Sequence, residues 1–252
     1  MLFWIIFFCL VGGVGGVVAA ASVLALREEL RRSLLPLLLS YATGTLLGAA
    51  FLGLLPESLE RAAPMAVSST ILVGILLFFL LEKLVIWHHC HAEICHSEIC
   101  EVHGHAGPLI LIGGALHHFV DGFVIAAAFL TSFPLGVAAA LAVFAHEIPQ
   151  KVGDFAILLD SGYPTRKAFL YNLLSALAIL PGAVIAYGYL GAMQAAVPYV
   201  LALSAASFIY IAMSDLVPDL HRHVALSATG WQFLLMSAGI GSIGILHLLG
   251  LG

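Results

Sequence analysis

The sequence predicts an all-α integral membrane protein with eight transmembrane helices and both termini outside. Of its 252 residues, 62% are hydrophobic and 9% are charged, whereas a soluble domain has about 45–50% apolar and about 25% charged residues. The apolar residues form blocks close to the length of about 20 residues that spans a bilayer, and the mean hydropathy is +1.10. The distribution of Lys and Arg predicts which connections between the helices face the cytoplasm. We expect residues 1–252 to form a single transmembrane domain.

The eight apolar blocks are separated by charged residues and prolines, as at residues 27–32, Pro56, Pro64 and Pro134. The first block has no positively charged start, so a retained helix is favoured over a cleaved signal peptide, although residues 19–21 resemble a cleavage site. The predicted spans are approximately 2–26, 34–56, 64–87, 108–131, 134–159, 165–189, 194–217 and 230–249.

Basic residues are concentrated in alternate connections. The even-numbered connections contain only Arg61, whereas the odd-numbered ones contain Arg27, Arg31, Arg32, Lys83, Arg166, Lys167 and Arg222. Cytoplasmic loops carry the excess of Lys and Arg, which predicts that the odd-numbered connections are cytoplasmic. We expect a multi-pass protein of a prokaryotic inner membrane, surrounded by lipid. No basic patch indicates nucleic-acid binding.

Glycine is frequent in the first block, at Gly12, Gly13, Gly15 and Gly16. Small residues let membrane helices approach closely, so these positions are interpreted as packing positions without a specific function.

The connection after the third helix, residues 88–107, differs sharply from the rest of the chain. Residues 88–105 include six His, three Cys and three Glu. Imidazole and thiolate are preferred ligands of zinc and softer metals, but the spacing matches no closed structural zinc site. We therefore predict a cytoplasmic metal-collecting loop that uses His88, His89, Cys90, His91, Cys95, His96, Cys100, His103 and His105.

The fourth predicted helix carries a first polar cluster inside an apolar span. His117 and Asp121 lie one turn apart on the same face, and His118 flanks that face. Ionisable groups inside a membrane are costly and usually serve a function.

The fifth predicted helix carries a second cluster. His146 and Gln150 form one i, i+4 pair, while Glu147, Lys151 and Asp154 form an adjoining stripe. Proline at position 149 removes a backbone hydrogen bond and should kink or loosen the helix there.

Together the two helices offer two imidazoles, a carboxylate and an amide oxygen from His117, His146, Asp121 and Gln150. This ligand set suits a divalent first-row metal. An intramembrane zinc protease is an alternative because His146–Glu147 begins like H-E-x-x-H, but the fifth position is Gln150 and the motif is broken. A non-transporting metal-sensing protein is a further alternative. No enzymatic activity and no catalytic cofactor are predicted.

The two clusters resemble the motifs of the ZIP (Zrt/Irt-like) family of divalent metal transporters. Residues 117–122 are similar to the family's H-N-x-x-D-G, and residues 146–155 to its H-E-x-P-H-E-x-G-D-F. The resemblance implies a ZIP-like helix bundle that carries zinc, or iron, manganese or cadmium, toward the cytoplasm by alternating access. It implies a primary site of His117, Asp121, His146 and Gln150, and a second site that draws on His118 and Glu147. A homodimer is a candidate assembly.

Three positions depart from the family pattern. His118 replaces Asn, Gln150 replaces His, and Lys151 replaces Glu. Because an ammonium group one turn from Glu147 could pair with it, we predict that Lys151 fills a degenerate second site and that one metal occupies the primary site.

Overall fold

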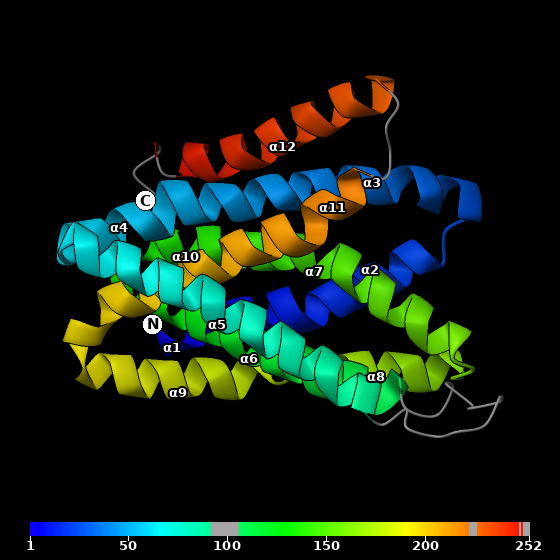
Figure 1. Ribbon diagram of the computed structural model, residues 1–252, viewed down its shortest axis with the longest axis horizontal. Helices are drawn as coiled ribbons and strands as arrows, with labels where there is room; N and C mark the ends of the chain where they lie inside the picture. The colour runs from blue at the N-terminus through cyan, green and yellow to red at the C-terminus, as the bar shows by residue number, and fades with distance from the viewer. Residues whose placement is uncertain (92–105, 222–225, 247, 249–252) are drawn as a thin grey trace.

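The computed structural model describes residues 1–91, 106–221, 226–246 and 248, and within these ranges the chain forms helices and no strands. The helices run mainly along the long axis of the molecule (Figure 1). In chain order they are α1 (Leu2–Leu10), η1 (Val11–Gly15), α2 (Gly16–Leu24), α3 (Glu28–Gly48), η2 (Ala49–Leu54), α4 (Leu55–Arg61), α5 (Pro64–His91), α6 (Ala106–Thr131), α7 (Phe133–Asp160), α8 (Thr165–Ala176), α9 (Ile179–Ala192), η4 (Gln194–Ala196), α10 (Val197–Tyr210), η5 (Ile211–Leu216), α11 (Val217–Leu220) and α12 (Leu226–Leu246).

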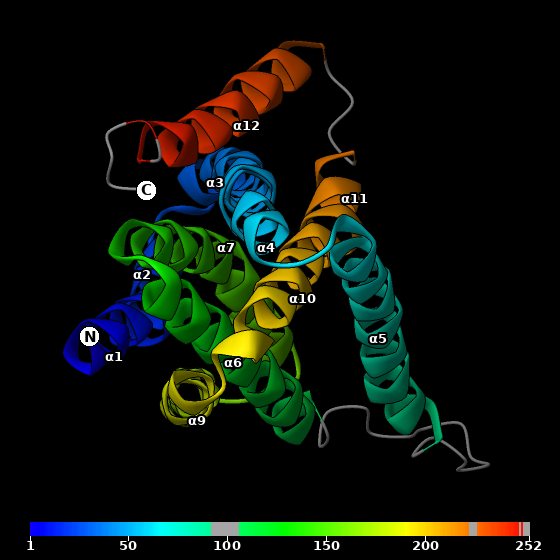
Figure 2. The same ribbon diagram turned by 90° about the vertical axis from the view of Figure 1, so that its left-hand side faces the viewer.

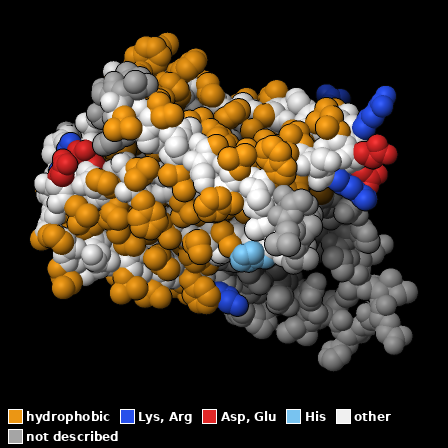
Figure 3. Space-filling view, turned by 90° about the horizontal axis from the view of Figure 1, so that it is seen from above, with side chains coloured by type: hydrophobic (Ala, Val, Ile, Leu, Met, Phe, Trp, Pro, Cys, Tyr) orange, Lys and Arg blue, Asp and Glu red, His pale blue; other side chains and the backbone are white. Residues whose placement is uncertain are grey.

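Seven helical stretches among the described residues are long and apolar enough to cross a membrane. Helix α7 is not one of them, because its 28 residues include the polar cluster predicted from the sequence. Figure 3 shows hydrophobic side chains over the middle of one face and most of the visible charged side chains near its ends. The chain is therefore a multi-pass integral membrane protein.

The order of the helices agrees with an even number of passes. The start of α1 and the end of α12 lie at the same end of the bundle (Figure 1). Seen along the bundle, α6 and α7 lie near its centre, whereas α5 and α12 lie at its edge (Figure 2). The parts of α6 and α7 that carry the polar clusters thus lie inside the bundle, where Asp121, His146 and Glu147 are fully buried.

The joints predicted at residues 27–32 and at Pro56 are displaced by a few residues, because the helices are interrupted at residues 25–27 and 62–63. Helix α3 begins at Glu28, and Arg32 pairs with Glu28 one turn away on an exposed helical face. The helix does not stop at Pro56, because π-helical η2 leads directly into α4. Pro56 lies in the first turn of α4, where a proline is tolerated. The π-helical turn before it has a different hydrogen-bond spacing from an α-helix, so the missing N–H of Pro56 does not end the helix.

The predicted span 165–189 is divided in the structure. Helix α8 ends at Ala176 and α9 begins at Ile179. Pro181 has no N–H to bond to the carbonyl of Leu177, and that carbonyl instead accepts from the N–H of Leu180 at 3.1 Å. The missing donor explains why the α-helix is interrupted here.

The predicted loop 88–107 is shorter in the structure at both ends. Helix α5 extends through His91 and α6 begins at Ala106. Five of the predicted loop ligands, Cys95, His96, Cys100, His103 and His105, lie outside the described residues, as does Arg222 of the orientation count. The metal-collecting loop therefore stays a prediction.

Helices α6 and α9 cross with their backbones in close contact. A Cβ atom at Gly122 would lie 2.0 Å from the carbonyl oxygen of Ile179, and one at Gly182 would lie 2.1 Å from the carbonyl oxygen of Phe119. Both obstacles are backbone atoms, which cannot rotate away. Glycine at these two positions is therefore needed for α9 to support the helix that carries the first cluster.

We predict that Gly182→Ala lowers the thermal stability of the purified protein, because overpacking at a close contact costs about 1–3 kcal/mol. Gly188→Ala on the same helix is the matched control, since a Cβ there meets nothing within 4 Å. The measurement is the Tm of both variants in detergent. Equal Tm values for Gly182→Ala and the wild type would contradict this account of the crossing.

Candidate metal site

The two polar clusters meet because a single residue, Ser132, connects α6 and α7. His117 lies 14 residues before Thr131, the end of α6, and His146 lies 13 residues after Phe133, the start of α7. At a rise of 1.5 Å per residue, both imidazoles lie about 20 Å along their helices from the connection. Because α6 and α7 are antiparallel and their clusters lie at similar distances from the connection, the two clusters come to the same level along the bundle.

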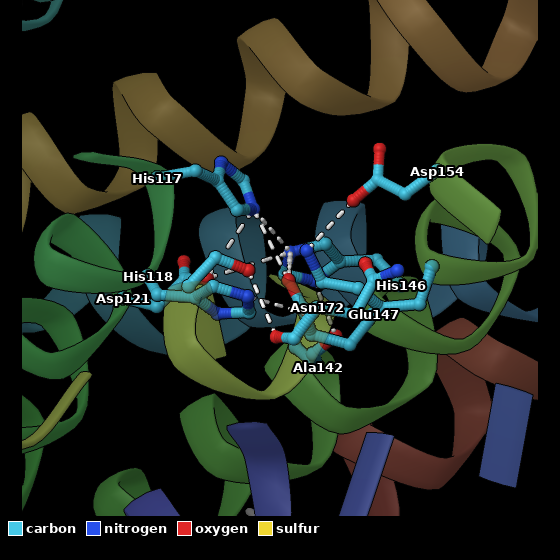
Figure 4. Close-up of polar contacts among 10 residues, drawn as sticks. His117, His118, Asp121, Ala142, His146, Glu147, Asp154 and Asn172 are labelled. Atoms are coloured by element: carbon cyan, nitrogen blue, oxygen red, sulfur yellow. Dashed lines mark hydrogen bonds and ion pairs between the residues drawn. The ribbon is translucent and has the colours of Figure 1, made fainter. Parts of the chain in front are cut away.

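Four side chains form the metal cluster: His117, Asp121, His146 and Glu147. Each offers one ligand atom, and these atoms all lie within 4.8 Å of one another. His117 and Asp121 come from α6, and His146 and Glu147 from α7. The four side chains converge between the two helices (Figure 4).

The measured separations suit ligands of a single ion. The Nε2 atom of His117 lies 3.2 Å from Nε2 of His146, 3.3 Å from Oδ2 of Asp121 and 3.3 Å from Oε1 of Glu147. The Nε2 atom of His146 lies 3.8 Å from the same Asp121 oxygen and 3.7 Å from the same Glu147 oxygen. Zinc lies about 2.0–2.2 Å from such ligands, so two tetrahedral ligands are about 3.4 Å apart.

The carboxylate oxygens of the cluster are buried without hydrogen-bond partners in the described part of the chain. Asp121, His146 and Glu147 are fully buried, and the His117 side chain is 19% exposed. Among the described residues, both oxygens of Asp121 and both oxygens of Glu147 accept no hydrogen bond. Buried polar atoms are nearly always paired, so four bare carboxylate oxygens indicate a missing cation.

The backbone orients one of the imidazoles. The Nδ1 atom of His146 lies 2.9 Å from the carbonyl oxygen of Ala142, one turn earlier in α7. A carbonyl oxygen only accepts, so Nδ1 donates and Nε2 keeps its lone pair for the cluster. This arrangement is typical of metal-binding histidines.

His118 lies beside the cluster rather than in it. Its Nε2 atom is 3.4 Å from Oε2 of Glu147, the oxygen opposite the one that faces His117. His118 is fully buried, and neither ring nitrogen has a hydrogen-bond partner among the described residues. Glu147 therefore connects the two sites that the sequence separated, because one carboxylate oxygen faces each.

Gln150 stays a predicted ligand. Its side chain is half-buried, and it lies one turn after His146 on α7. Among the His, Cys, Asp and Glu side chains of the described residues, Glu147 supplies the fourth ligand atom of the cluster. Sequence reasoning placed Glu147 in the second site only, because spacing along a helix does not reveal which way a carboxylate turns.

Lys151 forms its direct ion pair with Asp154, and among the described residues no ion pair within 4.0 Å joins it to Glu147. The degenerate second site stays a prediction. The Nζ atom of Lys151 lies 2.8 Å from Oδ2 of Asp154, and the Lys151 side chain is fully buried. The carboxylate of Glu147 is turned toward the imidazoles (Figure 4). Asp154 lies one turn after Lys151 on α7 and provides the carboxylate that pairs with it. This ion pair balances its own charge.

Asn172 is a further buried polar residue that the sequence did not single out. Its Nδ2 donates to the carbonyl oxygen of Ala168 at 3.1 Å, and its Oδ1 has no partner among the described residues. It lies on α8 and points into the region of the site in Figure 4. A lone Asn in a helix gives no spacing signal, so only the structure reveals it.

The comparisons with known proteins show which family the chain belongs to. The family model described as ZIP Zinc transporter matches residues 87–247, which is more than half of the chain. The chain belongs to the ZIP family. The segment of this chain that matches the family model includes α6 and α7 and all four cluster residues.

Individual ZIP relatives are zinc transporters by name. Human zinc transporter ZIP4 is 41% identical over 110 residues, which cover 44% of this chain and 17% of that protein. The Drosophila melanogaster zinc transporter foi is 37% identical over 134 residues, or 53% and 19% of the two chains. The Drosophila melanogaster ZIP13 homolog is 31% identical over 277 residues, covering 86% of this chain and 78% of the relative.

The matches thus span about a fifth of the length of ZIP4 and foi, but most of the ZIP13 homolog. The named relatives are transporters and not enzymes, and they give no support to the protease alternative.

We predict that Glu147→Ala weakens zinc binding more than Gln150→Ala does, because the Glu147 carboxylate faces both imidazoles of the cluster. Losing a charged ligand should reduce affinity at least about tenfold, whereas Gln150→Ala should cause a smaller loss. Zinc titration of the purified proteins measures both. A larger effect of Gln150→Ala would restore the ligand set expected from the sequence.

Proposed function

We propose that this chain transports zinc across the membrane toward the cytoplasm by alternating access, with the ion bound between α6 and α7. One observation carries the proposal. A cluster of two imidazoles and two carboxylates, His117, Asp121, His146 and Glu147, lies buried within a membrane bundle. Its carboxylate oxygens have no hydrogen-bond partners among the described residues, although imidazole nitrogens lie 3.3–3.8 Å away. The zinc transporters among the relatives support zinc as the cargo.

The charge of the cluster favours a divalent ion. Asp121 and Glu147 carry two negative charges when ionised, and the Lys151–Asp154 ion pair adds none. A single divalent cation would bring the sum to zero inside an apolar bundle, where each uncompensated charge costs several kcal/mol. Iron, manganese and cadmium would meet the same requirement, so zinc is proposed with these ions as competitors.

Alternating access follows from burial. Three of the four ligands are fully buried and only His117 is partly exposed. An ion held by all four groups can leave only if helices move or side chains turn, which is the usual behaviour of carriers with a site near the membrane midplane. Release is aided by acid, because a protonated imidazole cannot coordinate a metal.

The proposed topology has eight spans, namely the seven apolar stretches and α7, and it places both termini outside. This orientation rests on the excess of Lys and Arg in the odd-numbered connections. The relatives named above come from human and fly, so the prokaryotic inner membrane is not supported by them. A homodimer and a cytoplasmic metal-collecting role for residues 88–107 stay predictions.

We predict that His117→Ala and Asp121→Ala each abolish zinc uptake into proteoliposomes, because each removes a ligand that no neighbour replaces. Glu29→Ala, which removes an exposed carboxylate far from the site in sequence, should transport normally. Gel filtration and Tm values establish that the variants are folded. Normal uptake by both site variants would exclude these residues from transport, and peptide cleavage without uptake would favour the protease.

We also predict that one zinc ion binds in the buried site of each chain. Lys151 stands where the family's second motif has Glu, and its ion pair with Asp154 adds no net charge. Among the described residues, Asp121 and Glu147 alone therefore supply negative charge to the site. A second dication beside the first would exceed the two negative charges available. Anomalous diffraction from zinc-soaked crystals should give one strong peak between α6 and α7. Two adjacent peaks of full occupancy would overturn this prediction.

A further inference from the structure

Glu147 is packed directly against the backbone of the first membrane helix. A Cβ atom built on Gly16 would lie 2.8 Å from Cβ of Glu147 and 3.7 Å from its Cγ. Carbon atoms in contact are normally about 3.5–4.0 Å apart, so any side chain at this position would displace Glu147 or its helix. Gly16 is the first residue of α2 and directly follows π-helical η1.

The neighbouring glycines contact other parts of α7. A Cβ at Gly12 would lie 3.3 Å from Cγ1 of Val143, and one at Gly15 would lie 3.6 Å from Cε2 of Phe144. Gly12 and Gly16 are one turn apart, as are Val143 and Glu147, so the two helices pack turn against turn. Of these three contacts, only the one at Gly16 involves a residue of the metal cluster.

This contact matters because no hydrogen bond among the described residues fixes the carboxylate of Glu147. Its two oxygens lie 3.3 Å and 3.4 Å from imidazole nitrogens of His117 and His118, but neither has a hydrogen-bond partner among the described residues. The position of the carboxylate before an ion arrives therefore depends on how its Cβ and Cγ are packed. Metal ligands must be held to within about 0.5 Å of the working geometry.

We propose that Gly16 is a positioning residue for the metal site: its missing side chain lets Glu147 lie against the first helix with its carboxylate in the cluster. The inference rests on the proposed metal site and extends it to a helix that supplies no ligand. Gly16 also lies outside residues 87–247, which match the family model.

The test is the zinc affinity of Gly16→Ala in the purified full-length protein. Gly16→Ala should bind zinc about 10- to 100-fold more weakly, the usual effect of disturbing groups that support a ligand. Gly12→Ala and Gly15→Ala are matched controls in the same helix facing α7, and both should keep the affinity of the wild type. Zinc bound by Asp121→Ala, which retains residues 92–105, is subtracted to isolate the buried site.

A double variant separates positioning from general damage. In the Glu147→Ala background, Gly16→Ala should cause no further loss of zinc affinity, because there is no carboxylate left to displace. The ratio of zinc to cadmium affinity should change in Gly16→Ala and stay constant in both controls, since a shifted ligand alters the size of the site.

Several results would overturn the inference. These are wild-type affinity of Gly16→Ala, equal losses in the two controls, and a further loss in the Glu147→Ala background. Failure of Gly16→Ala to fold while both controls fold would also overturn it, because Gly16 would then be required for helix packing. If the wild type binds no more zinc than Asp121→Ala, the proposed site itself fails, and that result is distinct from the others.

Discussion

The burial of two carboxylates that accept no hydrogen bond from the described residues is the constraint on which the rest of the structure depends. Asp121 and Glu147 lie on neighbouring helices with no exposed surface and with no hydrogen bond to their oxygens among the described residues. An apolar bundle tolerates such groups only if a cation compensates them. The imidazoles of His117 and His146 lie next to these carboxylates, and imidazole is a ligand that transition metals prefer, so the compensating cation is expected to be a transition metal.

The surrounding helices keep the carboxylates together in different ways. The single-residue connection at Ser132 fixes the relative depth of α6 and α7. The glycine contacts between α6 and α9 hold the first cluster from one side, and the first helix supports Glu147 from another. The site therefore depends on close backbone contacts that contribute no ligand, which is how membrane helices associate where the hydrophobic effect is weak.

Much of this could be predicted from the sequence, and the exceptions have a common cause. The ends of α5, α6, α7 and α12 lie within about four residues of the predicted ends, because apolar blocks and helical spacing are local signals. The division between α8 and α9 and the continuation through Pro56 depend on individual hydrogen bonds. The partner of Lys151, the direction of Glu147 and the contact at Gly16 depend on side-chain torsions and on helices far apart in sequence, which no periodicity reveals.

The geometry of Glu147 bears on how many ions the site can hold. One of its oxygens faces His117 and His146 and the other faces His118, so the carboxylate could bridge two ions or serve one. A bridged pair of dications would bring four positive charges to a site whose two carboxylates carry two negative charges, because the Lys151–Asp154 ion pair adds no net charge. Electrostatic balance therefore favours one ion in the site.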